Sequence, residues 1–198
     1  MSFIYIANPG ISSPGTSDTD TIFGSNKDHT LNGAGGNDTL YGYPASDVAV
    51  PDGNDLLNGG DGNDFLYSGT GNDTFDGGSG FDWIWASSAI HHIDLSLKLD
   101  LGNLTATRTI RKFDANGSLI GTDQFSGIEN FGGTSNSDSF FSADPSYAPQ
   151  VGYRNFNISG WGGSDTFTQI PFGVAPFSPS WTAGGSRSNG MGVFYFWV

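Results

Sequence analysis

The chain has no cysteine and few basic residues. Its 198 residues include 7 Lys and Arg against 20 Asp and Glu, for a formal net charge of −13 at pH 7. Without cysteine the chain can form no disulfide, no thiolate metal site and no cysteine nucleophile. The acidic balance argues against nucleic acid or an anionic membrane as a direct partner, because both are recognised by basic surfaces.

Several kinds of segment are also missing. No apolar run is long enough to insert into a membrane. Residues 1–10 lack the charged start and long apolar stretch of a secretory signal, so we expect no export by that route. The chain has no His-Glu-x-x-His, no Gly-x-Ser-x-Gly and no P-loop motif. The sequence therefore predicts a protein that is not an enzyme.

What the chain does contain is 31 glycines, many of them in a nine-residue repeat that ends Asp-x-apolar-x and runs from Gly15 to Trp85. The clearest copies are GGDGNDFLY (59–67) and GGSGFDWIW (77–85). We count eight units, of which the fifth, residues 51–58, is one residue short. Their apolar eighth positions are Ile22, Leu31, Leu40, Ala49, Leu57, Leu66, Phe75 and Ile84. A regular period over this length is typical of a solenoid.

The repeat resembles the RTX, or hemolysin-type, calcium-binding nonapeptide. The resemblance implies that positions one to six form a turn and seven to nine a short parallel strand. Two units would then make one coil of an all-β parallel β-roll (a β-solenoid) of about four coils. The alternative, in which Gly-Asn-Asp turns only separate hairpins, is disfavoured because eight copies occur in phase.

The residue types suit a calcium site. Glycine tolerates the positive φ of tight turns, and calcium takes six to eight oxygens, mostly from carboxylates and carbonyls. One turn cannot supply them, so we expect each ion between turns two units apart, with about five Ca²⁺ ions in all. The predicted metal-site residues are Asp20, Gly33, Gly36, Asp38, Asp47, Gly53, Asp55, Gly60, Gly62, Asp64, Gly69, Gly71, Asp73, Gly78, Gly80 and Asp82.

Alternation of the eight units between two sides predicts two columns of these aspartates. The first column would carry Asp20, Asp38, Asp55 and Asp73, and the second Asp47, Asp64 and Asp82. Lys27 and His29 replace the usual glycine and aspartate of unit two, so we expect no ion at that end of the second column.

Folding of the repeat should depend on calcium. Twelve Asp precede residue 83, with Lys27 as the only base among them, and one buried apolar residue in nine offsets little of the entropy of ordering. For a site that binds at ~0.1 mM, 1 mM calcium adds about 1.4 kcal/mol. Five such sites would match the net stability of an ordinary domain. We therefore expect the repeat to fold outside the cell, where calcium is abundant.

The remainder divides into further segments. Residues 1–14 are interpreted as a lead-in, 15–85 as the roll, 86–131 as a strand and a protruding β-hairpin, 132–168 as a degenerate continuation of the roll, and 169–198 as an irregular aromatic segment. In the hairpin, residues 105–113 and 118–125 flank Asp-Ala-Asn-Gly, a strong turn signal. Its bases Arg108, Arg111 and Lys112 form either a docking patch for an anion or a solvated strand face.

The continuation is predicted from Phe131, Phe140, Ile158 and Phe167, which are 9, 18 and 9 residues apart. Asp138 and Asp165 lie three units apart, which predicts opposite sides of the roll and leaves their calcium binding open. The apolar residues 192–198 suit either a closing strand or the C-terminal signal that type I secretion reads in RTX-like proteins.

Positions seven and nine of each unit point outward, since side chains alternate along a strand. Units two, four, six and eight then show an apolar stripe that includes Val48, Phe65, Tyr67, Trp83 and Trp85. Such a stripe is seldom left in water, so either the C-terminal half or a partner chain covers it. We expect its four aromatic residues to form one cluster, buried under the C-terminal half.

Together these features favour a non-catalytic, calcium-dependent extracellular protein with a structural or binding role. Its roll would present surfaces for assembly or adhesion to copies of itself, to other proteins or to glycans, as a secreted, cell-surface, matrix or virion-exterior component. The alternative is the secretion and folding module of a type I secreted enzyme that acts on protein or polysaccharide.

Overall fold

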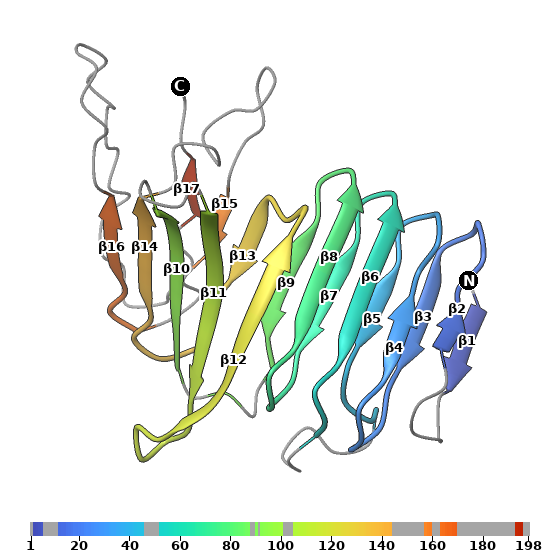
Figure 1. The fold of residues 1–198 in the computed structure, drawn as a ribbon, viewed down its shortest axis with the longest axis horizontal. Coiled ribbons are helices and arrows are strands. Elements are labelled where there is room, and N and C mark those ends of the chain that lie inside the picture. Colours follow the sequence, from blue (N-terminus) through green and yellow to red (C-terminus); the bar gives the residue numbers. More distant parts are fainter. Residues whose placement is uncertain are drawn as a thin grey trace.

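The computed structural model describes residues 2–5, 12–45, 52–87, 90, 92–100, 105–143, 157–159, 163–169 and 193–195. All regular elements in these ranges are β-strands. They stand side by side in two sheets along one axis, with the N-terminal coils at one end and the C-terminal half at the other (Figure 1).

Sheet A has eight strands, in the order β1 (Ser2–Tyr5), β3 (Asp20–Phe23), β5 (Thr39–Tyr41), β7 (Phe65–Ser68), β9 (Trp83–Ala86), β13 (Asn130–Gly132), β15 (Asn157–Ser159) and β17 (Val193–Tyr195). Sheet B has nine, in the order β16 (Thr166–Gln169), β14 (Ser139–Ala143), β10 (His92–Asp100), β11 (Thr105–Phe113), β12 (Leu119–Ser126), β8 (Thr74–Ser79), β6 (Leu56–Asp61), β4 (Thr30–Asn32) and β2 (Ser12–Pro14).

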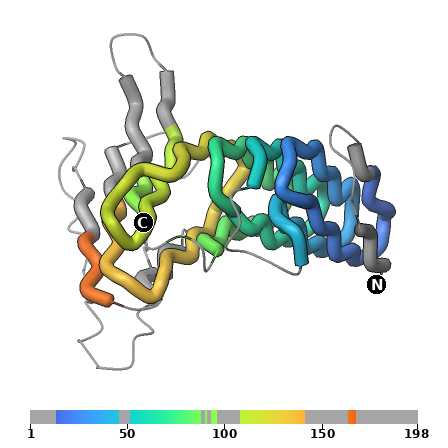
Figure 2. The backbone as a smooth tube through the Cα atoms, turned by 90° about the horizontal axis from the view of Figure 1, so that it is seen from below, coloured from blue at the N-terminus to red at the C-terminus, as the bar shows by residue number. Residues whose placement is uncertain are grey.

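Consecutive strands from β1 to β9 alternate between the sheets and pair in parallel within them. The backbone therefore winds in successive coils, which the view turned by 90° shows clearly (Figure 2). The predicted all-β parallel β-roll is confirmed. The roll also begins earlier than expected, because β1 and β2 lie in the segment interpreted as a lead-in.

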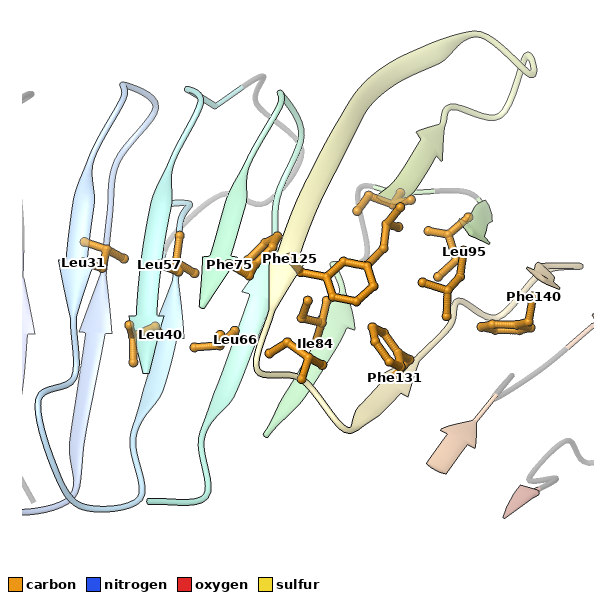
Figure 3. Packing of buried hydrophobic residues seen from close by; sticks show 14 of the residues in the cluster. Leu31, Leu40, Leu57, Leu66, Phe75, Ile84, Leu95, Phe125, Phe131 and Phe140 are labelled. Carbon is orange, nitrogen blue, oxygen red and sulfur yellow. The ribbon is translucent and has the colours of Figure 1, made fainter. Parts of the chain in front are cut away.

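The core is a double row of apolar side chains inside the coils (Figure 3). Each unit with a described strand contributes its eighth residue, and each of these residues is at most 2% exposed. Sheet A contributes Ile22, Leu40, Leu66, Ile84 and Phe131, and sheet B contributes Leu31, Leu57, Phe75 and Phe125. Because the facing strands, apart from β12, are only three to six residues long, a single inward apolar side chain from each strand fills the space between the sheets.

The predicted alternation of units is wrong after β5. Most parallel neighbours are 18 residues apart, but Thr39 pairs with Phe65 and Thr30 with Leu56, which are 26 apart. Among the described residues of units four and five (42–45 and 52–58), one strand, β6, begins and joins the sheets, where two strands were expected. Unit four has only an Ala at its eighth position. Pro44 is its third residue, and Pro51 follows its last residue. Proline has no N–H to donate to a neighbouring strand.

The hairpin is confirmed, but its expected protrusion from the roll is wrong. Strands β11 and β12 pair antiparallel, while β12 pairs in parallel with β8 and β11 pairs antiparallel with β10. The hairpin is therefore built into sheet B. Its turn is held by Asp114, whose carboxylate accepts the N–H groups of Asn116 and Ser118, and by Gly117 at φ +78°.

The continuation of the roll is also confirmed. Strand β13 pairs in parallel with β15, and β14 pairs in parallel with β10 and β16. The expectation that Asp138 and Asp165 lie on opposite sides is wrong, because the Asp138 N–H donates to Asp165 Oδ1 at 3.0 Å. Phe140 pairs with Phe167, 27 residues later, so one coil here has the length of three nine-residue units. Strand β17 pairs antiparallel with β15, which favours the closing-strand interpretation of residues 192–198.

Candidate metal centre

Acidic residues line up along the roll in the turns that precede sheet A. This A column consists of Asp20, Asp38, Asp64, Asp82 and Glu129. The main-chain N–H of each aspartate donates to a carboxylate of the next coil, at 2.7, 2.7, 2.8 and 3.1 Å in that order. One oxygen of each acceptor carboxylate is thereby fixed by the coil before it.

The corresponding B column consists of His29, Asp55 and Asp73, in turns that precede sheet B, and of Asp123 within β12. The N–H groups of the first three donate to the next carboxylate at 2.7, 2.9 and 2.9 Å. The predicted columns are therefore wrong in membership: Asp55 and Asp73 belong with His29, while Asp64 and Asp82 belong with Asp20 and Asp38. Asp47 lies outside the described residues.

In three central carboxylates of the two columns, the second oxygen, Oδ2, has no hydrogen-bond partner. Oδ2 of Asp38, Asp55 and Asp64 is buried and has no hydrogen-bond partner. Burial raises the pKa of Asp64 to about 6 and that of Asp55 to about 8. An ionised carboxylate out of contact with water is costly unless a charge or donors compensate it. A cation beside these oxygens would supply that compensation.

At two of these oxygens, those of Asp38 and Asp64, a main-chain carbonyl approaches the same glycine. A Cβ placed on Gly33 would overlap both Asp38 Oδ2 and the Gly59 carbonyl, and one on Gly59 would overlap Asp64 Oδ2 and lie 2.6 Å from the Gly77 carbonyl. Carboxylate and carbonyl oxygens are what calcium prefers. The residues present therefore fit calcium held by carboxylate and carbonyl oxygens. The described residues contain no group of three His, Cys, Asp or Glu side chains that could hold a metal.

The predicted turn glycines are required by the same geometry. At Gly62, φ is +138° and a Cβ would overlap the Gly36 carbonyl of the preceding coil. Glycine alone tolerates both conditions. Positive φ also occurs at Gly36, Gly60, Gly71, Gly78 and Gly80, while Gly53 and Gly69 leave no room for a Cβ beside Asp28 and Asp52, respectively.

A second ladder, at position five of the repeat, was missed by the sequence analysis. The Asn63 N–H donates to the side-chain oxygen of Asn37, and the Phe81 N–H donates to that of Asn63. On the other side, Asn54 donates to Asp28 and Asn72 to Asn54. The repeated Gly-Asn-Asp was the available signal, since amide side chains often bond neighbouring main-chain groups in turns.

Carboxylates near the ends of the roll have partners within the chain. Thr16 donates to Asp20 Oδ2 through both its N–H (2.7 Å) and its hydroxyl (2.8 Å). Thr134 donates to Asp138 in the same way, with its N–H at 2.7 Å from Oδ2, and the Ile93 N–H donates to Oδ1 at 2.8 Å. At the place predicted to lack an ion, His29 Nε2 lies 2.7 Å from the Ser25 hydroxyl, and burial lowers its pKa.

The predicted basic patch on the hairpin does not exist in that form. Lys112 is completely buried and bound to Asp73 and Asp123, so both the docking patch and the solvated strand face are wrong for this residue. Burial by itself would lower the pKa of Lys112, but the two carboxylates outweigh burial and raise it. Arg111 is half exposed and pairs with Asp94 at 3.5 Å.

The outer face of sheet A carries a stacked aromatic ladder. Ring centroids are 4.6 Å apart for Phe23 and Tyr41, 4.4 Å for Tyr41 and Tyr67, 6.4 Å for Phe65 and Trp83, and 5.4 Å for Trp83 and Trp85. The corrected alternation of strands joins the predicted stripe to the N-terminal rings. The predicted burial is wrong, because Phe65 is 40% exposed and the other rings are only partly covered. Val48 lies outside the described residues.

Comparison with known proteins agrees with this geometry. The pattern of the RTX calcium-binding nonapeptide repeat matches residues 14–49 and 52–84, in four copies. Such repeats bind calcium, and proteins that carry them are typically secreted. No curated protein matches the chain. The described residues include no helix long and apolar enough to span a membrane. Residues 14–49 and 52–84 of this chain are therefore RTX calcium-binding nonapeptide repeats.

Proposed function

We propose that the chain is a non-catalytic extracellular assembly protein, in which calcium stiffens the roll and the outer face of sheet A binds a second copy. The observation that supports calcium dependence is the set of buried, unpartnered oxygens on Asp38, Asp55 and Asp64. Without a cation these groups disfavour the closed coils. With calcium the same groups become ligands, so coil formation and ion binding are one process.

The aromatic ladder supports assembly through sheet A. The seventh and ninth positions of β3, β5, β7 and β9 are all Thr, Phe, Tyr or Trp, so the face carries no charge although the chain is strongly acidic. Two copies can therefore approach through this face without the like-charge repulsion that acts elsewhere. The rings stack mainly on one another, which leaves few ring faces for sugars, so a second copy is a better occupant than a glycan.

The test is a calcium titration of chelator-stripped protein, followed by far-UV circular dichroism and light scattering. We expect a cooperative gain of β-structure near millimolar calcium and a defined oligomer in the calcium-loaded state. A monomer with full β-structure would refute assembly and favour the alternative, a module of a larger secreted enzyme. No response to calcium would refute the calcium dependence itself.

Two matched variants locate the interface. Phe65 and Leu56 both occupy seventh positions and are 40% and 41% exposed, but Phe65 lies on sheet A and Leu56 on sheet B. We expect Phe65→Ser to give calcium-loaded monomers, while Leu56→Ser still assembles. Equal loss of assembly in both variants would contradict the assignment to sheet A.

A further inference from the structure

The side chain of Lys112 leaves the hairpin and ends inside the B column. Its Nζ lies 2.6 Å from Asp123 Oδ1, 2.8 Å from Asp73 Oδ2 and 3.1 Å from the Ser68 hydroxyl oxygen. Ser68 in turn donates to Asp123 Oδ2 at 2.7 Å. An ammonium has three N–H donors, and three oxygens surround it here. The ammonium therefore bridges the carboxylates of two successive coils.

The carboxylate oxygen that binds Lys112 corresponds to the oxygen that has no partner in the central coils. At Asp38, Asp55 and Asp64, Oδ1 accepts a main-chain N–H and Oδ2 is buried without a partner. At Asp73, Oδ1 likewise accepts the Asp55 N–H, but Oδ2 binds Lys112. The lysine thus supplies a positive charge to the equivalent oxygen of the repeat.

Glycine at position 121 leaves room for the lysine. Gly121 is the partner of Lys112 across the β11–β12 pair. A Cβ on it would lie 2.9 Å from Lys112 Cε and would overlap the Gly71 carbonyl. The long, flexible stem of lysine then reaches from the hairpin strand to the turn.

We propose that the Lys112 ammonium replaces a calcium ion between Asp73 and Asp123. This inference rests on the proposed calcium binding of the other turns. It assigns Asp73, which the sequence places among the calcium ligands, to a cation that the chain itself carries. The junction between the roll and the hairpin then keeps its structure without calcium, whereas the coils around Asp38 and Asp64 require the ion.

The first test compares Lys112→Met with Arg111→Gln by native mass spectrometry in calcium. Both variants remove one positive charge from neighbouring positions of β11, but Arg111 is 50% exposed and pairs with Asp94, which is not a column carboxylate. We expect Lys112→Met to bind one calcium more than the wild type and Arg111→Gln. We also expect Lys112→Met to melt at a lower temperature than the wild type in chelator and to recover in calcium.

An unchanged number of ions in Lys112→Met would overturn the replacement. A wild type that binds no calcium would instead overturn the calcium-dependent function. Hydrogen exchange of the wild type in chelator gives a second test that needs no variant. The amides of Asp73 and Gln124, which donate to Asp123 and to the Asp73 carbonyl, should exchange at least about tenfold more slowly than those of Asp38 and Asp64. Equal exchange at the two places would overturn the inference.

Discussion

Replacing Asp64 by Asn separates the two roles of a column carboxylate. Oδ1 of Asp64 accepts the Asp38 N–H at 2.7 Å, and Asn can keep that bond. Oδ2 is buried and unpartnered, close to the position where the Gly77 carbonyl approaches Gly59. An amide nitrogen in place of Oδ2 removes the negative charge and can donate a hydrogen bond to the nearby Gly77 carbonyl. The variant should therefore gain stability in chelator and lose part of its response to calcium.

The size of both effects follows from the site. Asp64 is 0% exposed, and burial raises its pKa from 3.8 to about 6. Such a rise corresponds to a cost of about 3 kcal/mol for the ionised form at neutral pH and above. Asn avoids this cost, which sets the upper limit of the gain in chelator. In 1 mM calcium, each lost site of ~0.1 mM affinity removes about 1.4 kcal/mol from the stabilisation by the ion.

The assay is urea unfolding at pH 7.5, in chelator and in 1 mM calcium, for the wild type and for Asp64→Asn. Asp61→Asn is the matched control, because Asp61 lies three residues before Asp64, at the end of β6, but is exposed. The control should change neither the stability in chelator nor the calcium response by more than about 0.5 kcal/mol. If Asp64→Asn were less stable than the wild type in chelator, or responded fully to calcium, the assignment of this carboxylate to a cation site would be refuted.

Three further perturbations test the turns. Gly62→Ala should destabilise the calcium-loaded protein by about 2 kcal/mol or more, because φ is +138° and the Gly36 carbonyl lies in the way; Gly35→Ala, whose nearest new contact is 3.8 Å, should be neutral in the same urea assay. Ala34 has φ +72°, so Ala34→Gly should stabilise by about 1 kcal/mol, and a loss of stability would contradict the strain. The folded pKa of Asp55, about 8, lies above its ordinary 3.8 because of burial, so the calcium-free fold binds the extra proton. Its urea midpoint in chelator should therefore fall as pH rises from 5 to 8, and a flat or rising midpoint would contradict the burial of this carboxylate.

The core could be predicted from sequence because each strand is too short to offer alternatives. In strands of three to six residues with strict alternation, the apolar eighth residue points inward, as Leu40, Leu57 and Leu66 do. The sheet to which each unit belongs could not be predicted, because units alternate between the sheets and one unit without a strand shifts the assignment of all units after it. The nine-residue pattern predicts a half-coil for the degenerate unit at residues 42–50. It therefore assigns Asp55 to the column of Asp64, and Asp64 to the column of Asp55.

Residues contributed from beyond the repeat were the least accessible to sequence reasoning. Asp123 and Glu129 have the local form acid-x-apolar-x, ending in Phe125 and Phe131, but no nine-residue phase connects them to the repeat, since the hairpin intervenes. Lys112 had no signal at all: a lysine on a strand next to a turn usually points to solvent. Only the pairing of β12 with β8 brings its ammonium to Asp73.

The distribution of partners along the roll explains why calcium should matter most at its centre. Asp20 at the N-terminal end and Asp138 in the continuation receive hydroxyl and N–H donors from Thr16 and Thr134, which stand four residues earlier in their own turns. Asp73 receives the Lys112 ammonium. Between these places, Asp38 and Asp64 have only an added cation to complete them. Turns whose carboxylates have donors within the chain therefore lie on both sides of the turns that need the ion. When calcium binds, the central coils can fold onto ends that are already formed.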